Sequence, residues 1–233
     1  MTCMLASVRS VEEARLMVGA GADVIDLKEP ADGVLGALPL PTVREIISGL
    51  DGRVQVSATV GDIKGDLDRI GSVASDMAKA GVDIVKVGLF DRLDIDRLLL
   101  GLAAIVDDGI RIVLVTFAEH DGHRIDVRKV AAAGLSGVMV DTVEKRSGSL
   151  LQKVPAKALG EFVRDAHGAG LVSGLAGALR AEDVSELLPL QADYLGFRSA
   201  LCKGSEREQR ICIRRAQIIR ALIPEHAAVV EVR

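Results

Sequence analysis

The chain has 233 residues, of which 49% are hydrophobic and only 2% aromatic, and its formal net charge at pH 7 is -4. The length suits one domain of the size of an eight-stranded α/β barrel, so we expect residues 1–233 to form a single catalytic domain. The acidic balance and the scarcity of aromatic rings argue against a partner that is nucleic acid or an anionic membrane.

Apolar periodicity and turn residues predict that strands alternate with helices along the chain. The predicted strands are residues 2–7, 24–28, 54–59, 84–89, 112–117, 138–141, 171–173 and 194–197. A capping-box pair, Ser10 and Glu13, begins the first predicted helix, which ends near Ala20. The other predicted helices begin near residue 41 or span residues 67–80, 95–106, 126–133, 156–169, 182–188 and 206–222. The long loop 29–39 is expected to lie over one end of the sheet.

Strict alternation of strands and helices makes the predicted sheet parallel. Eight units favour an α/β fold of the single-domain (β/α)8 TIM-barrel type over an open doubly wound sheet, and no GxGxxG motif follows the first strand. The three cysteines have no CxxC spacing, and the chain has neither a signal-peptide pattern nor an apolar run of membrane-spanning length. We therefore expect a cytoplasmic protein.

One pattern recurs four times, at residues 20–28, 80–88, 133–141 and 190–198, and each copy ends in a predicted strand. Because strand side chains alternate between two faces, one face of these strands is entirely apolar and should pack against helices. The other face carries charged residues close to the strand ends: Asp26, Lys28, Lys86, Asp141 and Arg198. Charges are rarely buried without a function, and barrel active sites lie at this end of the strands.

Lys28 and Lys86 are the strongest catalytic candidates. Two ammonium groups in one dry pocket lower each other's pKa, and a lysine with a lowered pKa attacks carbonyl groups to form a Schiff base. Asp26 and Asp141 are candidates for holding the lysines and moving protons; alternatively, they only neutralise the lysines in a structural network. Lys145 is placed to reach the barrel mouth, although lysines in loops are usually solvated.

Small residues follow the seventh and eighth strands, where many barrels bind phosphate through backbone N–H groups. The candidate phosphate-binding residues are Gly177, Ala178, Arg198, Ser199 and Lys203. Ordinary tight turns would explain the glycines equally well.

His120 and His123 flank a turn, and no third ligand accompanies them, so we expect no metal and no cofactor. We also expect a homo-oligomer, because the last helix and residues 227–230 offer apolar surface, although packing beneath the barrel would explain that surface too.

Six short motifs together resemble a known family along nearly the whole chain. They are VIDLK at 24–28, VSATVGD at 56–62, VKVGL at 85–89, DTVEK at 141–145, LAG at 175–177 and CKG at 202–204. The family is that of the (5-formylfuran-3-yl)methyl phosphate synthases, also called 4-(hydroxymethyl)-2-furancarboxaldehyde-phosphate synthases. Residues 117–123 are less similar to this family.

The resemblance implies that the partner is a small phosphorylated aldehyde. It implies an α/β barrel that joins two molecules of glyceraldehyde 3-phosphate into a phosphorylated furan aldehyde, with loss of phosphate and water, on the pathway to methanofuran. It further implies that Lys28 forms the Schiff base and that Lys86 transfers protons. Two such substrates need two anion sites. Gly177, Arg198 and Ser199 are candidates for one site, and Lys145 or Lys203 for the other.

Three other activities remain open. A class I aldolase of the deoxyribose-phosphate aldolase type would share the lysine pair and the barrel. A phosphosugar-binding sensor would need no reactive amine, and a metal-dependent isomerase would lose activity with a chelator.

Overall fold

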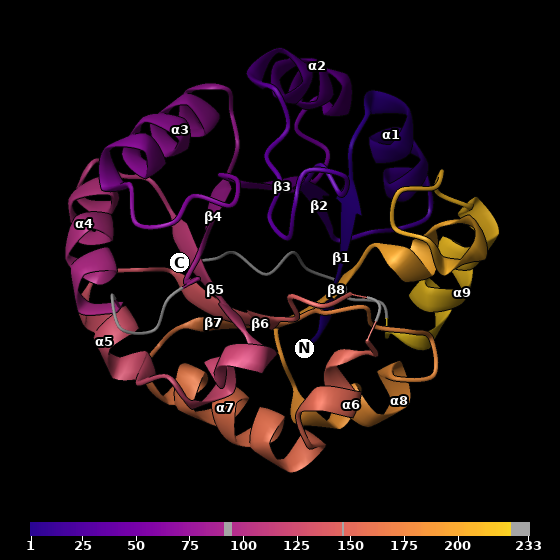
Figure 1. Cartoon of the computed structure of the whole chain (residues 1–233). Coiled ribbons are helices and arrows are strands. Elements are labelled where there is room, and N and C mark those ends of the chain that lie inside the picture. Colours follow the sequence, from indigo (N-terminus) through magenta and orange to yellow (C-terminus); the bar gives the residue numbers. More distant parts are fainter. Residues whose placement is uncertain (91–94, 146, 225–233) are drawn as a thin grey trace.

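Eight parallel strands pair in chain order, and β1 closes the barrel by pairing with β8 (Figure 1). This computed structural model describes residues 1–90, 95–145 and 147–224. The strands are β1 (Cys3–Val8), β2 (Val24–Leu27), β3 (Gln55–Thr59), β4 (Ile84–Gly88), β5 (Ile112–Phe117), β6 (Gly137–Asp141), β7 (Val172–Leu175) and β8 (Tyr194–Phe197). The predicted α/β barrel is thus confirmed.

Helices surround the strands in Figure 1. They are α1 (Val11–Gly19), α2 (Leu40–Leu50), α3 (Leu67–Lys79), α4 (Ile95–Asp107), α5 (Val127–Ala132), α6 (Leu150–Lys153), α7 (Ala156–Gly168), α8 (Val184–Leu187) and α9 (Ile213–Leu222). Ser10 caps α1, because its hydroxyl accepts the N–H of Glu13 at 3.2 Å. The Glu13 carboxylate accepts the N–H of Arg9 rather than that of Ser10, so only half of the predicted capping box forms.

The apolar side chains form two cores, one outside the strands and one inside the barrel. The outer core lies between the sheet and the helices, and it contains the apolar positions of the fourfold pattern: Ile25, Leu27, Val85, Val87, Val138, Val140, Leu195 and Phe197. The inner core is also mostly aliphatic, with Leu5, Val113, Val115 and Met139 among its members. Charged side chains that face inward must therefore lie above this inner apolar core, toward the ends of the strands.

The predicted helix over 206–222 is wrong in its first half, because α9 begins only at Ile213. Residues 199–212 instead form two short 3-10 turns and an antiparallel bridge between Cys202 and Ile211. The carbonyl groups of Arg207 and Gln209 accept hydrogen bonds from the Arg198 guanidinium, and this contact competes with helix formation. No local pattern in the sequence reveals such a distant donor.

Strand β7 extends to Leu175, two residues beyond the predicted end at Ser173. Gly174 disfavours a strand by propensity, but a Cβ atom there would lie 2.5 Å from Cε of Met139, so a larger residue would force the Met139 side chain to move. The short helix α6 lies between β6 and α7, where no helix was predicted.

No helix among the described residues has the length and apolarity needed to cross a lipid bilayer. Two apolar side chains of α9 are exposed, Ile218 at 58% and Leu222 at 45%. Residues 227–230, the other half of the predicted oligomer surface, lie outside the described residues, so the homo-oligomer stays a prediction.

The Arg220 guanidinium anchors α9 to the end of the barrel where the strands begin. It donates to Asp23 Oδ2 at 2.5 Å and to the carbonyls of Gly21 at 3.2 Å and Ile223 at 2.8 Å. Asp23 Oδ2 also accepts the N–H of Met4 at 2.7 Å, so one carboxylate ties β1 to the last helix.

We expect Arg220→Ala to lower the free energy of unfolding by about 2–4 kcal/mol, because it removes a largely buried charge from these acceptors. Arg220→Lys, which keeps the charge but not the planar fork, should lose less. Urea unfolding of both variants measures this, and an unchanged midpoint for Arg220→Ala would show that the contact does not stabilise the fold.

Candidate active site

Four charged side chains lie inside the barrel near the ends of strands β2, β4 and β6. Asp26 lies on β2, Lys28 follows directly after it, Lys86 lies on β4, and Asp141 ends β6. Their exposed fractions are 1%, 8%, 4% and 4%, so all four are buried. The period-2 alternation that predicted an inward charged face therefore placed them correctly.

Lys86 and Asp26 form a tight ion pair across the interior, with Lys86 Nζ 2.5 Å from Asp26 Oδ1. Two hydroxyls complete the shell of this carboxylate: Ser7 donates at 2.7 Å and Ser57 at 2.8 Å. Burial alone would raise the pKa of Asp26, but the charges of Lys86 and Lys28 and the hydrogen bonds outweigh it and lower that pKa. Asp26 is thus held as an anion.

Asp141 binds two lysines. Lys145 donates a short hydrogen bond to Asp141 Oδ1, while Lys28 Nζ lies 3.7 Å from Oδ2. The N–H of Thr142 adds a third donor at 2.7 Å. Burial opposes ionisation, but the charges of Lys145 and Lys28 and these hydrogen bonds hold the pKa of Asp141 well below its ordinary value. Lys145 is therefore not solvated; its side chain is only 12% exposed.

Lys28 has the electrostatic setting of a reactive amine. Burial lowers its pKa, the Asp141 charge raises it, and the nearby Lys145 and Lys86 charges lower it again, leaving the pKa at about 7. Three lysines share two carboxylates in this cluster, so the cations are in excess. A substantial fraction of Lys28 is consequently neutral at physiological pH, the form that attacks carbonyl carbon.

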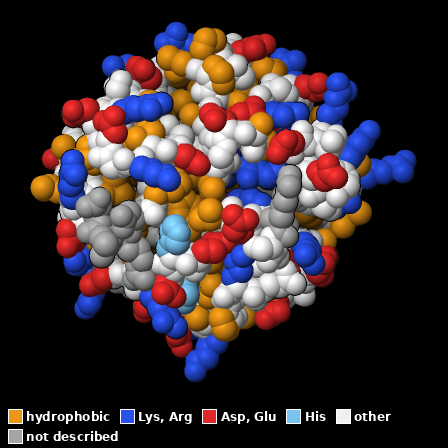
Figure 2. Space-filling model, viewed as in Figure 1, with side chains coloured by type: hydrophobic (Ala, Val, Ile, Leu, Met, Phe, Trp, Pro, Cys, Tyr) orange, Lys and Arg blue, Asp and Glu red, His pale blue; other side chains and the backbone are white. Residues whose placement is uncertain are grey.

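A narrow cavity of about 40 Å³ leads to this cluster, and Lys28, Lys86 and Asp141 line it. A larger cavity of about 520 Å³ lies beside it and extends toward α9. Lys145, Ala178 and Ser199 line both cavities, so the two adjoin at the rim of the barrel. Figure 2 shows basic side chains gathered near the middle of this face, with acidic side chains beside them.

Four of the five predicted phosphate-binding residues line the narrow cavity: Gly177, Ala178, Arg198 and Ser199. The backbone N–H groups of Gly177, Ala178 and Ser199 donate no hydrogen bond to any residue that the structure describes. Gly177 has φ of +116°, and a Cβ atom there would lie 2.6 Å from Cγ2 of Thr142, so only glycine fits. Their role in binding phosphate stays a prediction.

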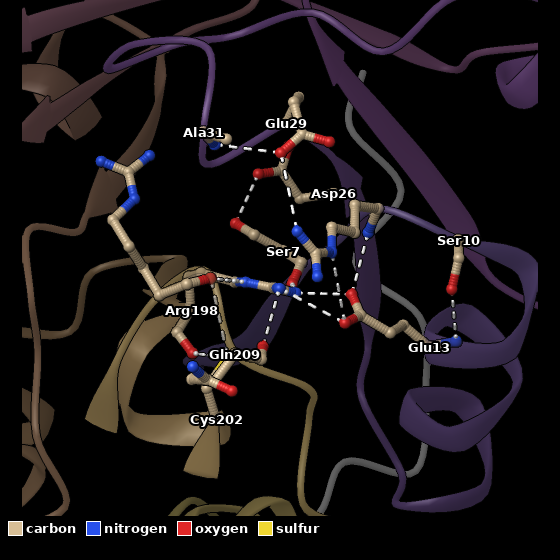
Figure 3. Close-up of polar contacts among 11 residues, drawn as sticks. Ser7, Ser10, Glu13, Asp26, Glu29, Ala31, Arg198, Cys202 and Gln209 are labelled. Carbon is tan, nitrogen blue, oxygen red and sulfur yellow. Dashed lines mark hydrogen bonds and ion pairs between the residues drawn. The ribbon is translucent and has the colours of Figure 1, made fainter. Parts of the chain in front are cut away.

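The Arg198 side chain lines this cavity, but its donors are directed at other parts of the protein. Its guanidinium donates to both carboxylate oxygens of Glu13 and to the carbonyls of Ser7, Arg207 and Gln209 (Figure 3). These five bonds use all five of its N–H donors, which leaves none for phosphate. The side chain holds loops together at the rim instead.

Lys203 is exposed and lines neither cavity, so the structure does not bring it to the site.

Several residues of the site were missed from the sequence. Ser7 and Ser57 bind Asp26, and their alternation with apolar neighbours was the available signal. Arg207 lines the narrow cavity, but the sequence placed it in a helix. Leu35 of the loop between β2 and α2 also lines this cavity, so that loop covers the barrel mouth as expected.

The described residues include no group of three or more His, Cys, Asp and Glu side chains arranged to hold a metal ion. The positively charged layer at the mouth would itself disfavour a cation.

Comparison with known proteins settles the family. The family model of 4-HFC-P synthase matches residues 4–220. The chain belongs to this family, whose members are enzymes. A Methylorubrum extorquens protein that carries the name (5-formylfuran-3-yl)methyl phosphate synthase is 41% identical over 208 residues, 89% of this chain and 86% of that protein.

A second member of the 4-HFC-P synthase family, the (5-formylfuran-3-yl)methyl phosphate synthase of Methanocaldococcus jannaschii, is 32% identical over 217 residues, or 88% of this chain and 92% of that protein. Among solved structures, phosphoribosyl anthranilate isomerase from Thermus thermophilus superposes with a TM-score of 0.69 at 14% identity, covering 95% of this chain and 98% of that one. That likeness concerns the fold alone.

The lowered pKa predicts how Lys28 reacts with an amine-acylating reagent. Labelling of Lys28 should rise through about pH 7 and then level off, because the neutral amine dominates above its pKa. The exposed Lys79 and Lys203 serve as internal controls in the same digest. Their labelling should keep increasing toward pH ~10, the ordinary range of lysine.

Lys145→Met should move the Lys28 midpoint upward, because it removes a neighbouring cation and leaves Asp141 to Lys28. Mass spectrometry of the labelled peptides gives both profiles. A Lys28 profile that follows the two exposed lysines would contradict the assignment.

Proposed function

We propose that this chain condenses two molecules of glyceraldehyde 3-phosphate into (5-formylfuran-3-yl)methyl phosphate, with loss of phosphate and water, through a Schiff base on Lys28. The observation that carries the proposal is the buried Lys28 amine, with a pKa of about 7, inside a barrel of the 4-HFC-P synthase family. Synthesis of a furan aldehyde from trioses needs carbonyl activation, which an imine supplies without a metal.

The neighbours of Lys28 suit the successive steps. The neutral amine adds to the substrate aldehyde, water leaves, and the resulting iminium makes the adjacent C–H acidic. Lys86 can pass its proton to Asp26, its partner at 2.5 Å, and the neutral Lys86 amine is then placed to take the proton from carbon. The enamine then attacks the second aldehyde, and elimination of phosphate and water forms the aromatic ring, which makes the overall reaction hard to reverse. Hydrolysis of the imine releases the furan aldehyde and returns the Lys28 amine.

Lys145 and Asp141 support the same steps from the other side of Lys28. Asp141 stays ionised beside the iminium and stabilises its positive charge. Lys145 lines both cavities and supplies a cation where the two substrates meet. In this proposal the product feeds methanofuran synthesis, and the chain works in the cytoplasm without a cofactor.

A class I aldolase of the deoxyribose-phosphate type remains the second candidate, because the buried lysine pair would serve it equally well. That reaction is reversible and yields an open-chain sugar phosphate. The conjugated furan aldehyde absorbs in the ultraviolet, so product identification after incubation with glyceraldehyde 3-phosphate alone separates the two activities.

Borohydride reduction in the presence of glyceraldehyde 3-phosphate should add the mass of the reduced adduct to the peptide that contains Lys28. Lys28→Ala should lose the adduct and the furan product. Lys86→Ala should keep the adduct and lose at least about a hundredfold in turnover, because its expected role is proton transfer.

Other outcomes point elsewhere. An adduct that persists in Lys28→Ala and disappears in Lys86→Ala would reverse the two roles. No adduct in the wild-type chain would favour a sensor, and activity lost on chelation would favour a metal-dependent isomerase.

A further inference from the structure

The loop between β8 and α9 is fixed to the first strand–helix unit by Arg198. Glu13 is 7% exposed, and its Oε2 lies 2.5 Å from Nη1 of Arg198. From this anchor, Nε of Arg198 reaches the carbonyl of Arg207 at 2.7 Å, and Nη2 reaches the carbonyl of Gln209 at 3.3 Å. Figure 3 shows Arg198 between Glu13 and Gln209. The backbone around residue 207 is thereby held at the rim of the barrel.

This anchoring presents the Arg207 side chain to the barrel mouth. Arg207 lines the narrow cavity together with Lys28, Lys145 and Asp141. One Nη2–H donates to the carbonyl of Gly33 at 3.0 Å. Its remaining N–H donors bind none of the residues that the structure describes. The two arginines thus differ. Every guanidinium N–H of Arg198 binds another residue of the protein, whereas most guanidinium N–H groups of Arg207 bind none of the described residues.

The loop between β2 and α2, whose Gly33 carbonyl accepts the Arg207 hydrogen bond, is also held in place. Asp62 accepts the N–H groups of Val34 at 2.9 Å and Leu35 at 2.6 Å, and Thr59 donates its hydroxyl to the carbonyl of Gly36 at 2.9 Å. Arg207 therefore spans two separately anchored loops above the lysine cluster. A guanidinium held at one end, with free donors toward a cationic cavity, is preorganised for an anion.

We propose that Arg207 binds the phosphate group of a bound substrate, with Glu13 and Arg198 acting as the residues that position it. The guanidinium fork matches a phosphate monoester in a bidentate contact, which an ammonium group does not reproduce. Gly177, Ala178 and Ser199 line the same cavity, and their N–H groups bind no other residue in the described ranges, so they complete the anion site. The choice of a phosphorylated aldehyde as ligand rests on the proposed function.

The residues that line the narrow cavity carry a charge imbalance that a phosphate would relieve. Five basic residues line the cavity, and only two of its lining residues, Asp26 and Asp141, are acidic. Arg198 is neutralised by Glu13, which leaves Lys28, Lys86, Lys145 and Arg207 against two carboxylates. Burial and the loss of hydration make this excess costly, and they lower the pKa of Arg207. A dianionic phosphate monoester restores the balance, whereas a neutral aldehyde does not.

Titration of the full chain with inorganic phosphate in a calorimeter tests the binding directly, without relying on turnover. Arg207→Gln should weaken phosphate binding about tenfold to a hundredfold, the range for a lost charge-assisted contact. Arg207→Lys should recover part of that loss. Arg210→Gln, an exposed arginine of the same loop, is the matched control and should bind phosphate like the wild-type chain.

A second measurement separates phosphate recognition from a structural role. Borohydride trapping of glyceraldehyde, which lacks the phosphate, should proceed at the wild-type rate in Arg207→Gln, while trapping of glyceraldehyde 3-phosphate becomes slower at low concentration. Equal losses for both aldehydes, or unchanged phosphate affinity in Arg207→Gln, would overturn the proposal. If the wild-type chain forms no adduct with either aldehyde, the Schiff-base function fails, and the calorimetric comparison still decides whether Arg207 binds phosphate.

Discussion

An excess of positive charge enclosed by an aliphatic barrel is the constraint on which the rest of this structure depends. Lys28, Lys86 and Lys145 share two carboxylates in a space that excludes most water. A fall in the pKa of Lys28 from 10.5 to about 7 corresponds to about 5 kcal/mol. Because the folded pKa lies below the unfolded one, the folded state carries this full cost below pH 7 and is relieved of it as the pH rises toward 10.5. Burial of the two apolar cores has to offset that cost, which is a common arrangement at sites kept for chemistry.

The structure assigns the charged residues to two tasks by their surroundings. Inside the barrel, Lys28 and Lys86 lie deep in the cavity with carboxylates as their main partners. At the rim, the Arg198 guanidinium donates its hydrogen bonds to Glu13 and to backbone carbonyls, so it holds loops in place. The same residue type therefore serves structure at position 198 and, in our proposal, recognition at position 207. Donor occupancy, rather than charge alone, distinguishes the two.

Much of the fold and the inner part of the site followed from the sequence, because both depend on local periodicity. The alternation of side chains placed Asp26, Lys28, Lys86 and Asp141 on one face, and the parallel barrel brought their strand ends together. The contacts at the rim of the barrel could not be predicted from the sequence, because they join residues that are far apart in the chain. Glu13 and Arg198 are separated by 185 positions, and nothing in either local segment indicates the pairing. The non-helical course of residues 206–212, and hence the placement of Arg207, depends on that same contact.

The two buried lysines are not equivalent, because their carboxylate partners have different numbers of cations. Besides Lys86, Asp26 is bound by only the Ser7 and Ser57 hydroxyls and feels the more distant charge of Lys28. A buried carboxylate stripped of its close counter-ion is costly. If Lys28 gave up its proton, Asp141 would still hold Lys145 and the N–H of Thr142. The separations agree with this difference, since Lys86 lies 2.5 Å from its carboxylate and Lys28 lies 3.7 Å from a carboxylate that it shares. Deprotonation at Lys28 therefore leaves every carboxylate paired with a cation, which is why we place the attack on the substrate carbonyl at this residue rather than at Lys86.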